Sequence, residues 1–335
     1  MTQVRIDLKL TFHLERQRMI WTEKIFGAKN RRTYRSLMTI FMCLLQMTLS
    51  QCTQARFVPN GYVIFTARDF AIYKYTQEYP DGKMIYQLDS SGDRMITAVA
   101  YDLERKLIAI AEKNKEPHRG TAVIKIFNVE TSSVVNEFVT DKDRINGMTI
   151  DREGRIAFTA GDMYLDNPGE LCYLSLDDGH VHTIAKGAHF FSPAWSKDLK
   201  RVYFGFSPAY KQSPSDRIGY VELATPNTIR QIAEGRSVSI SDSGKVAYLT
   251  NSGDIVLMEK IYDMSGVAKQ LLRHVDPKFT NSIRFVKGTE DIMIRHWKVT
   301  GLFSDLIVLK PPYKKEKLML PYIGMQDYDA GYVKN

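Results

Sequence analysis

The sequence predicts an all-β protein folded as a β-propeller of six four-stranded blades, with a seven-bladed propeller as the alternative. A repeat unit recurs along residues 51–322, and successive units begin their second strands 44 to 49 residues apart. Each unit carries short segments rich in β-branched and aromatic residues, which favour strands. Four such strands in about 40 to 50 residues are typical of propeller blades. A seventh blade would have to come from the less regular N-terminus.

A tight turn follows the first strand of every unit. Asp, Asn, Ser and Gly dominate these turns, because their side chains cap a hairpin or because glycine tolerates a positive φ. The second strands then begin at Tyr62, Lys106, Arg155, Arg201, Lys245 and Asp291. The six turns are residues 59–61, 102–105, 151–154, 196–199, 242–244 and 287–290.

Third and fourth strands complete the units. The predicted third strands are residues 70–75, 122–127, 171–176, 218–223, 254–259 and 305–309. Fourth strands include residues 133–139, 181–185 and 228–232. No helical period of useful length competes within this region. We therefore assign residues 51–322 to the propeller and residues 323–335 to a C-terminal tail.

The basic charge belongs mostly to an N-terminal segment, residues 1–50. The whole chain carries a formal net charge of +8, and residues 1–36 hold nine Lys/Arg against three Asp/Glu. The remainder is close to neutral. A basic patch for nucleic acid needs clustered charge on the folded domain, so we do not expect nucleic-acid binding.

Residues 37–50 within that segment contain an apolar stretch. It follows a basic flank and precedes small residues, which is the plan of a secretory signal peptide. It is shorter than the ~20 residues of a comfortable membrane span. We expect a secreted protein, with Met19 as a sensible alternative start. In the alternative, the stretch is part of the fold of a cytoplasmic protein. Membrane contact is expected only if residues 37–50 remain as an anchor.

Composition and cysteine usage describe a soluble, monomeric domain. The chain has 335 residues, of which 44% are hydrophobic and 25% charged. The three cysteines, Cys43, Cys52 and Cys172, have no zinc-ligand spacing. We expect Cys172 to be a buried thiol in a strand. A Cys52–Cys172 disulfide would require an oxidising compartment.

One mouth of the central channel is the predicted binding site. Segments that lead into the innermost strands of a propeller gather there, and ligands favour such concave positions. Arginines at a mouth would bind a small anionic ligand or an acidic protein segment through bidentate hydrogen bonds. In the alternative, these arginines point outward or pair with Asp93, Asp141 and Asp143. The predicted site residues are Arg94, Arg144, Asn146, His189, Arg236 and Asn281.

No motif in the sequence describes a complete catalytic site. There is no nucleophile elbow and no glycine-rich phosphate loop. His180 and His182 share one face of a strand, but we expect them to be solvated and not to bind metal. Long loops at residues 113–120 and 207–216 suit a protein partner. The expected function is therefore non-enzymatic binding without a cofactor.

Residues 144–206 resemble six-bladed propellers of the gluconolactonase/regucalcin type. The resemblance is carried by Arg144-Ile-Asn-Gly-Met-Thr-Ile-Asp-Arg-Glu-Gly-Arg. It implies, as an alternative function, a divergent hydrolase that uses a divalent cation. In that family Glu, Asn and Asp hold the cation; here the Asn and Asp positions fall on Phe191 and Arg236, and residues 51–58 offer no Glu. Arg144 and Asn146 match positions that would contact substrate.

A second resemblance is to WD-repeat propellers. Residues 96–130 are similar to a WD blade, in which Phe127-Asn128 stands where Trp-Asp usually stands. The signature covers one blade. It implies a protein-binding scaffold.

Overall fold

The structure is a computed structural model. It describes residues 58–88, 93–114, 121–161, 169–208, 216–259, 269–274, 280–297, 303–323 and 325–333. The chain divides into two compact units, Met1–Ala55 and Arg56–Asn335. The predicted signal or anchor at residues 37–50 lies outside the described residues, and so do most residues of the loops at 113–120 and 207–216.

In the second unit, the described residues form 23 antiparallel strands in five hydrogen-bonded sheets. The first sheet joins the last strand of the chain to the first three, in the order β23 (Met325–Tyr332), β1 (Tyr62–Arg68), β2 (Ala71–Tyr75), β3 (Lys83–Gln87). The second contains β4 (Arg94–Asp102), β5 (Leu107–Asn114), β6 (Val123–Asn128) and β7 (Ser133–Val139).

The largest sheet has seven strands. They are β8 (Ile145–Ile150), β9 (Ile156–Ala160), β10 (Gly169–Leu174), β11 (Val181–Trp195), β12 (Arg201–Ser207), β13 (Arg217–Glu222) and β14 (Arg230–Glu234). The long strand β11 pairs with β10 through its first half and with β12 through its second half. It is therefore the outer strand of one four-stranded set and the inner strand of the next.

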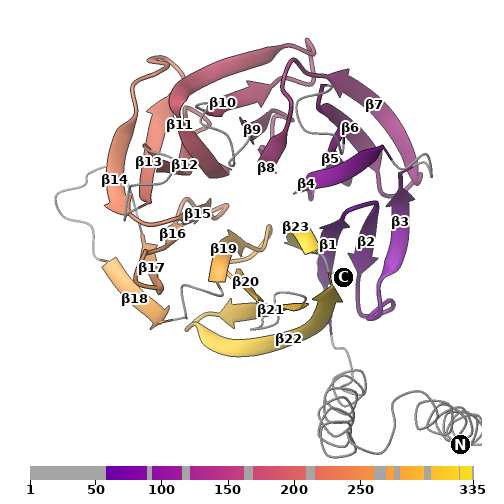
Figure 1. The fold of residues 1–335 in the computed structure, drawn as a ribbon. Coiled ribbons are helices and arrows are strands. Elements are labelled where there is room, and N and C mark those ends of the chain that lie inside the picture. The colour runs from indigo at the N-terminus through magenta and orange to yellow at the C-terminus, as the bar shows by residue number, and fades with distance from the viewer. Residues whose placement is uncertain are drawn as a thin grey trace, which may run out of the picture. The chain divides into compact units, whose positions relative to one another are not determined.

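Two further sheets of four strands complete the ring. One is β15 (Ser237–Ile240), β16 (Val246–Leu249), β17 (Asp254–Met258) and β18 (Lys269–His274). The other is β19 (Thr280–Phe285), β20 (Ile292–Trp297), β21 (Phe303–Lys310) and β22 (Lys314–Ile323). Figure 1 shows the sheets standing around a central axis, with β4, β8, β15, β19 and β23 nearest to it. This is a β-propeller, and the predicted all-β fold class is confirmed at that level.

The C-terminal residues correct the predicted domain boundary. Residues 323–335 are not a tail outside the propeller, because Met325–Tyr332 forms β23 and pairs with β1. The reason is an alternating pattern: Tyr328 and Ala330 are buried against Ile64 and Met293, while Asp327 and Asp329 point to the other face. The chain's end thus supplies the innermost strand of its first sheet.

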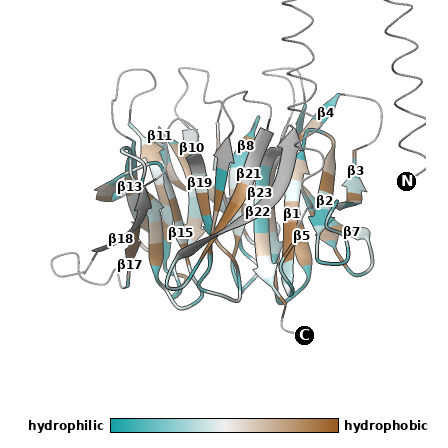
Figure 2. Ribbon diagram, turned by 90° about the horizontal axis from the view of Figure 1, so that it is seen from below, coloured by the Kyte–Doolittle hydropathy of each residue, from teal (hydrophilic) through white to brown (hydrophobic). Residues whose placement is uncertain are grey.

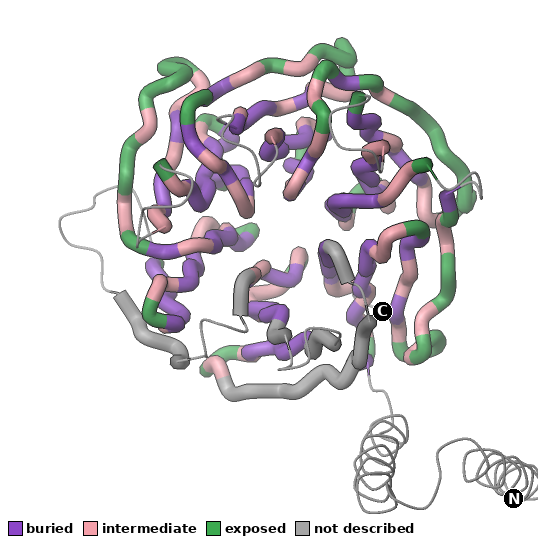
Figure 3. The backbone as a smooth tube through the Cα atoms, viewed as in Figure 1, coloured by how far each residue is buried: buried purple, intermediate pink, exposed green. Residues whose placement is uncertain are grey.

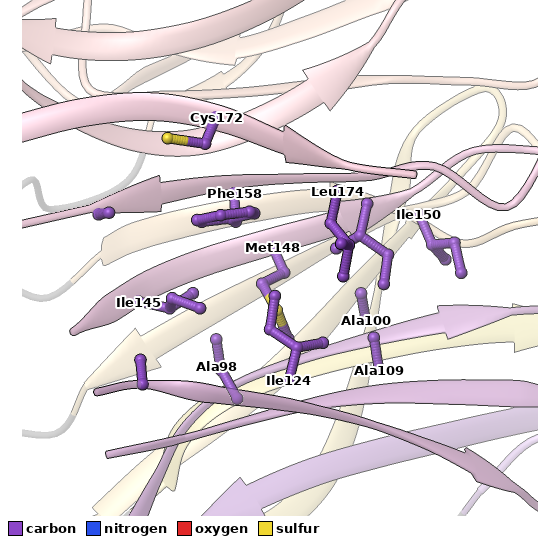
Figure 4. Close-up of a cluster of buried hydrophobic side chains, with 14 of the residues drawn as sticks. Ala98, Ala100, Ala109, Ile124, Ile145, Met148, Ile150, Phe158, Cys172 and Leu174 are labelled. Atoms are coloured by element: carbon purple, nitrogen blue, oxygen red, sulfur yellow. The ribbon is translucent and has the colours of Figure 1, made fainter. Parts of the chain in front are cut away.

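The core lies between neighbouring sheets. In each four-stranded set, the residues of the inner three strands whose burial is described are largely buried, and outer strands such as β7 are exposed (Figure 3). Figure 4 shows one cluster, in which Ala98 and Ala100 of β4 face Met148 of the next sheet. Hydrophobic residues lie within the strands, and hydrophilic ones mark the turns at the rims (Figure 2). Small alanines at the narrow centre let the sheets approach one another.

The turns behave as their sequences predict. Asp102 Oδ1 accepts hydrogen bonds from the backbone N–H groups of Glu104 and Arg105 at 3.0 Å. Asp151 Oδ1 accepts from the N–H groups of Glu153 and Arg155 at 2.8 and 2.9 Å. Ser196 and Ser241 cap the corresponding turns of later blades, each accepting from a backbone N–H with its hydroxyl. Side-chain caps of this kind fix the hairpins that end the innermost strands.

Within the described part of the chain, no helix has the length and apolar character needed to cross a membrane.

Candidate functional site

The central channel has two mouths, which we name by the direction of the innermost strands. These strands begin at the N-terminal mouth, where Arg94 opens β4 and Arg144 immediately precedes β8. They end at the C-terminal mouth, where the capped turns after β4, β8 and β15 lie. The two mouths differ in their side chains.

The N-terminal mouth is less basic than its sequence predicts. Arg94 Nη1 lies 3.3 Å from the buried carboxylate of Glu112, and its Nε donates to Asn114 Oδ1 at 3.4 Å. Arg236 Nε lies 3.9 Å from Asp216 Oδ2. Both arginines are therefore paired, with acids other than those weighed from the sequence.

Arg144 and Asn146 form the polar part of this mouth. The Arg144 carbonyl accepts from the Gly161 N–H at 3.2 Å, and Asn146 Nδ2 donates to the Gly161 carbonyl at 2.6 Å. Arg144 Nε, Asn146 Oδ1 and Thr159 Oγ1 are buried and have no hydrogen-bond partner among the described residues. Buried polar atoms without partners are uncommon in folded proteins and point to an absent water or ligand.

A β-bulge positions Asn146. The β8–β9 register shifts between Ile145 and Gly147, so that Asn146 is the extra residue, and bulges re-aim the side chain they carry. Thr97 occupies the same place in β4, where the register shifts between Ile96 and Ala98, and its Oγ1 is also buried without a partner among the described residues.

Positions equivalent to Asn146 and Thr97 recur in the other innermost strands at a regular spacing, and we call this set of positions the ring. His189 lies on β11 and is half-buried, and the backbone of Asn281 lies in β19. Asn281 and Arg236 belong to the ring; Arg94, Arg144 and His189 precede it in their strands. Counting five residues before each capped turn gives Thr97, Asn146, Phe191, Arg236 and Asn281, and the last spacing of 45 continues to Gln326.

The ring does not fit the divalent cation that the gluconolactonase resemblance implies. Hard cations need oxygen ligands. Phe191 instead packs against Gly205, where an added Cβ would come within 2.2 Å of the Phe191 ring. Arg236, the other ligand position, carries positive charge. No group of three or more His, Cys, Asp or Glu side chains in the described ranges could hold a metal ion.

A pocket opens at the C-terminal mouth, where the sequence predicted no site. It has a cavity volume of about 340 Å³ and reaches up the channel to Met148, Ser192 and Val238. Its wall includes Trp195, which is 7% exposed, and whose indole N–H is buried without a partner in the described part of the chain. None of the six predicted site residues lines it.

A buried ionic cluster forms one side of this pocket. Arg284 of β19 contacts both carboxylate oxygens of Asp327 on β23, at 3.0 and 3.2 Å. Arg284 Nη1 lies 3.7 Å from Asp329 Oδ2, and Lys287 Nζ lies 3.2 Å from the same oxygen. We call Arg284, Lys287, Asp327 and Asp329 the closing cluster, because they join the last strands of the chain to one another.

The closing cluster also covers the free inner edge of β4. Asp327 accepts from the Val99 N–H at 3.0 Å, and Asp329 accepts from the Tyr101 N–H at 2.8 Å. Arg284 donates to the Val99 carbonyl at 3.3 Å, and Lys287 donates to the Tyr101 carbonyl. Every channel-facing backbone group of these two residues is thereby satisfied.

Burial dominates the electrostatics of the cluster. It raises the pKa of the Asp327 carboxyl above the usual 3.8, although Arg284 opposes that rise. Burial also raises the pKa of Tyr328 to about 12, and the Tyr328 hydroxyl donates to the Met293 carbonyl at 3.1 Å. Charges this deeply buried are retained only with well-placed partners.

Two serines of β15 cover the free inner edge of β19 in the same way. Ser237 Oγ of β15 accepts from the Ile283 N–H at 3.2 Å, and Ser239 Oγ accepts from the Phe285 N–H at 2.9 Å. Side chains of one innermost strand thus cover the free edge of the next. The pattern is the same as that of Asp327 and Asp329 over β4.

The remaining candidates have structural roles. His180 and His182 are exposed and lie 3.7 and 3.9 Å from Asp178, with no third ligand among the described residues. Cys172 is a buried free thiol, and burial raises its pKa to about 11, which makes it unreactive. Cys52 lies outside the described residues.

The signal for the closing cluster was present in the sequence. Asp327 and Asp329 flank Tyr328 in a strand-like alternation, and Gln326 continues the 45-residue spacing. The pocket had no comparable signal, because backbone edges and scattered side chains form it.

Among the comparisons with known proteins, the match to one solved structure supports the fold. A chain of the solved nidogen/laminin complex matches with a TM-score of 0.59 at 10% sequence identity, over 81% of this chain and 98% of that chain. A gluconolactonase from Xanthomonas campestris matches with a TM-score of 0.47 at 13% identity, over 68% of this chain and 75% of that one. No family model matches, and no curated protein matches. At such identities the likeness shows a propeller fold and nothing finer.

Proposed function

We propose that this chain is a six-bladed, non-enzymatic binding propeller whose N-terminal mouth engages the carboxylate or phosphate groups of a partner. Counting β11 once in each of its two sets gives six blades of four strands. Arg144 would be the anchor for the anionic group. Asn146 and Thr97 would contact the polar atoms around it.

The observation that carries the proposal is the state of Arg144. Arg94 and Arg236 already face acids, whereas no ion pair joins Arg144 to any described residue. Its Nε and the neighbouring Asn146 Oδ1 are buried without partners in the same described ranges. A guanidinium held in this way offers bidentate hydrogen bonds to a carboxylate or phosphate.

The anionic group has two sources, a small anion or an acidic segment of a protein. The chemistry at Arg144 is the same for both, so an experiment has to distinguish them. The hydrolase alternative is not proposed, because Phe191 and Arg236 occupy its ligand positions.

The test measures binding of three probes to the full chain by calorimetry and thermal unfolding: inorganic phosphate, citrate and a heptaglutamate peptide. We expect at least one probe to bind, and Arg144→Ala to lose about tenfold or more in affinity, the loss of one charge-assisted hydrogen bond. Arg152→Ala, an exposed arginine at the other mouth, is the matched control. If no probe binds, or if both variants bind like the parent, the proposal is wrong.

A further inference from the structure

The inner edge of β8 differs from those of β4 and β19, which side chains of the preceding innermost strand cover. In β19, the Val286 N–H bonds outward to the Asp291 carbonyl of its own sheet, while the Phe285 N–H points into the channel and bonds to Ser239. Successive N–H groups of a strand point to opposite edges. The residues one and three positions before each capped turn therefore face the channel.

This rule places Met148 and Ile150 on the channel edge of β8. The Asp151 N–H bonds outward to the Arg155 carbonyl at 3.0 Å, so the N–H and C=O groups of Ile150, and of Met148 two residues earlier, face inward. Both residues line the pocket and are buried. Nothing in the described part of the chain bonds to their inward N–H groups.

The neighbouring strand explains why this edge is bare. Ser237 and Ser239 lie four and two residues before Ser241, and they cover the edge of the next strand. The residues four and two before Asp102 are Ala98 and Ala100. Alanine has no polar atom to offer, so the edge of β8 stays open to whatever occupies the pocket.

The chemistry of the pocket selects a neutral ligand. The closing cluster pairs its own charges, and Asp102 and Asp151 are bound to Arg105 and Arg155 at 2.7 and 2.8 Å. The other charged residues of the lining, Glu104, Arg152, Lys197 and Asp242, lie on the turns at the rim and include two of each sign. Deeper in the channel the polar groups are the backbone N–H and C=O groups of β8, side by side. A hydroxyl both donates and accepts, and so it matches an N–H and C=O pair. Hydroxyls also line the pocket on Thr149, Ser192, Ser239 and Ser241.

We propose that the C-terminal mouth holds a second binding site, for a neutral polyhydroxylated small molecule that bonds to the inner edge of β8. The cavity of about 340 Å³ is in the range of small-molecule pockets, roughly 300–1,000 Å³. The site does not depend on Arg144 or on any other residue of the N-terminal mouth.

The test is an NMR titration of the full chain with myo-inositol and D-glucitol. We expect the backbone amide signals of Met148 and Ile150 and the indole signal of Trp195 to shift with saturation. Those of Val99 and Tyr101, already bonded to the closing cluster, should stay in place. Gluconate and triglycine test the ligand class. Tighter binding of either than of both polyols would overturn the assignment, and so would the absence of any shift with the polyols.

A variant tests the site itself. Thr149→Val keeps the shape of the side chain and removes one pocket hydroxyl, and we expect it to weaken polyol binding by about five- to tenfold. Thr228→Val, at an exposed position outside the pocket, should bind like the parent. Equal affinity in both variants would mean that the polyol binds elsewhere and would overturn the proposal.

Discussion

The two sides of the channel differ in how the channel-facing backbone groups of the innermost strands are hydrogen-bonded. On the side formed by β19, β23 and β4, charged side chains cover every channel-facing backbone group of Val99 and Tyr101. On the side where β4 meets β8, Ala98 and Ala100 offer no polar atom, and no described residue bonds to the inward N–H groups of Met148 and Ile150. The first side joins β19 and β23 to β4 through buried charges, and we expect it to contribute stability. The second gives up hydrogen bonds that a ligand can supply. The contrast shows that in a propeller the residues beside a strand edge decide whether the channel is sealed or receptive.

The largest expected effect comes from breaking the closing cluster. Arg284→Met leaves Asp327 and Asp329 with too little positive charge, and we expect a loss of about 3–5 kcal/mol in the free energy of unfolding. Arg105→Met removes a partly exposed partner of Asp102 and should cost less than about 1 kcal/mol. Urea unfolding measures both. Equal costs would show that the closing cluster does not stabilise the fold.

The cost of Arg284→Met should also depend on pH. The folded pKa of Asp327 already lies above the usual 3.8 because of burial, and losing Arg284 raises it further. A carboxyl whose folded pKa exceeds its unfolded pKa binds protons preferentially in the folded state. The variant therefore recovers stability relative to the parent as the pH falls toward that range. A cost that is constant or grows on acidification would contradict this.

A smaller effect is expected at the serine pair. Ser239→Ala removes the acceptor of the buried Phe285 N–H, and an unsatisfied buried donor costs about 1–3 kcal/mol. Ser243→Ala, on the exposed turn nearby, should change stability by less than about 0.5 kcal/mol. Thermal unfolding compares them. If Ser239→Ala unfolds like Ser243→Ala, the serines are not covering that edge.

The smallest expected effect comes from a substitution that would cover the β8 edge with a hydroxyl, as Ser239 covers the edge of β19. Ala100→Ser places a hydroxyl where β15 has Ser239. We expect it to slow hydrogen exchange of the Ile150 amide while changing stability by less than about 1 kcal/mol, because the new hydroxyl gains a hydrogen bond. Ala109→Ser, in the same buried cluster (Figure 4), should leave that amide unchanged and cost about 1–3 kcal/mol. Identical exchange at Ile150 in both variants would mean that the introduced hydroxyl does not reach the β8 edge.

The sequence predicted the repeat and most strand positions well, because turns and alternating strands are local features. β7 matches its predicted range of residues 133–139, and β2 begins within one residue of its own. β23 was not predicted and its residues were assigned to a C-terminal tail, since its partner β1 lies more than 250 residues away in the chain. The burial of its two aspartates follows from Arg284 and Lys287, and no local pattern pairs residues that far apart.

The residues of the predicted site have different surroundings in the structure, and the sequence could not show all of them. Arg144 and Asn146 lie together at the N-terminal mouth, and their role in binding stays a prediction. Arg94 and Arg236 pair with Glu112 and Asp216. Those acids belong to other segments of the chain, so only the folded structure brings them near. The pocket at the C-terminal mouth was not predictable, because what defines it is the absence of a side chain over the β8 edge in the described residues.

Native-state amide hydrogen exchange of the unliganded chain tests the central claim most directly. Exchange reports local access to solvent separately from global unfolding. We predict that Val99, Tyr101, Ile283 and Phe285 exchange only with global unfolding, while Met148 and Ile150 exchange ~100-fold faster or more. Equal protection of the two sets would show that the β8 edge is already satisfied and would contradict the account.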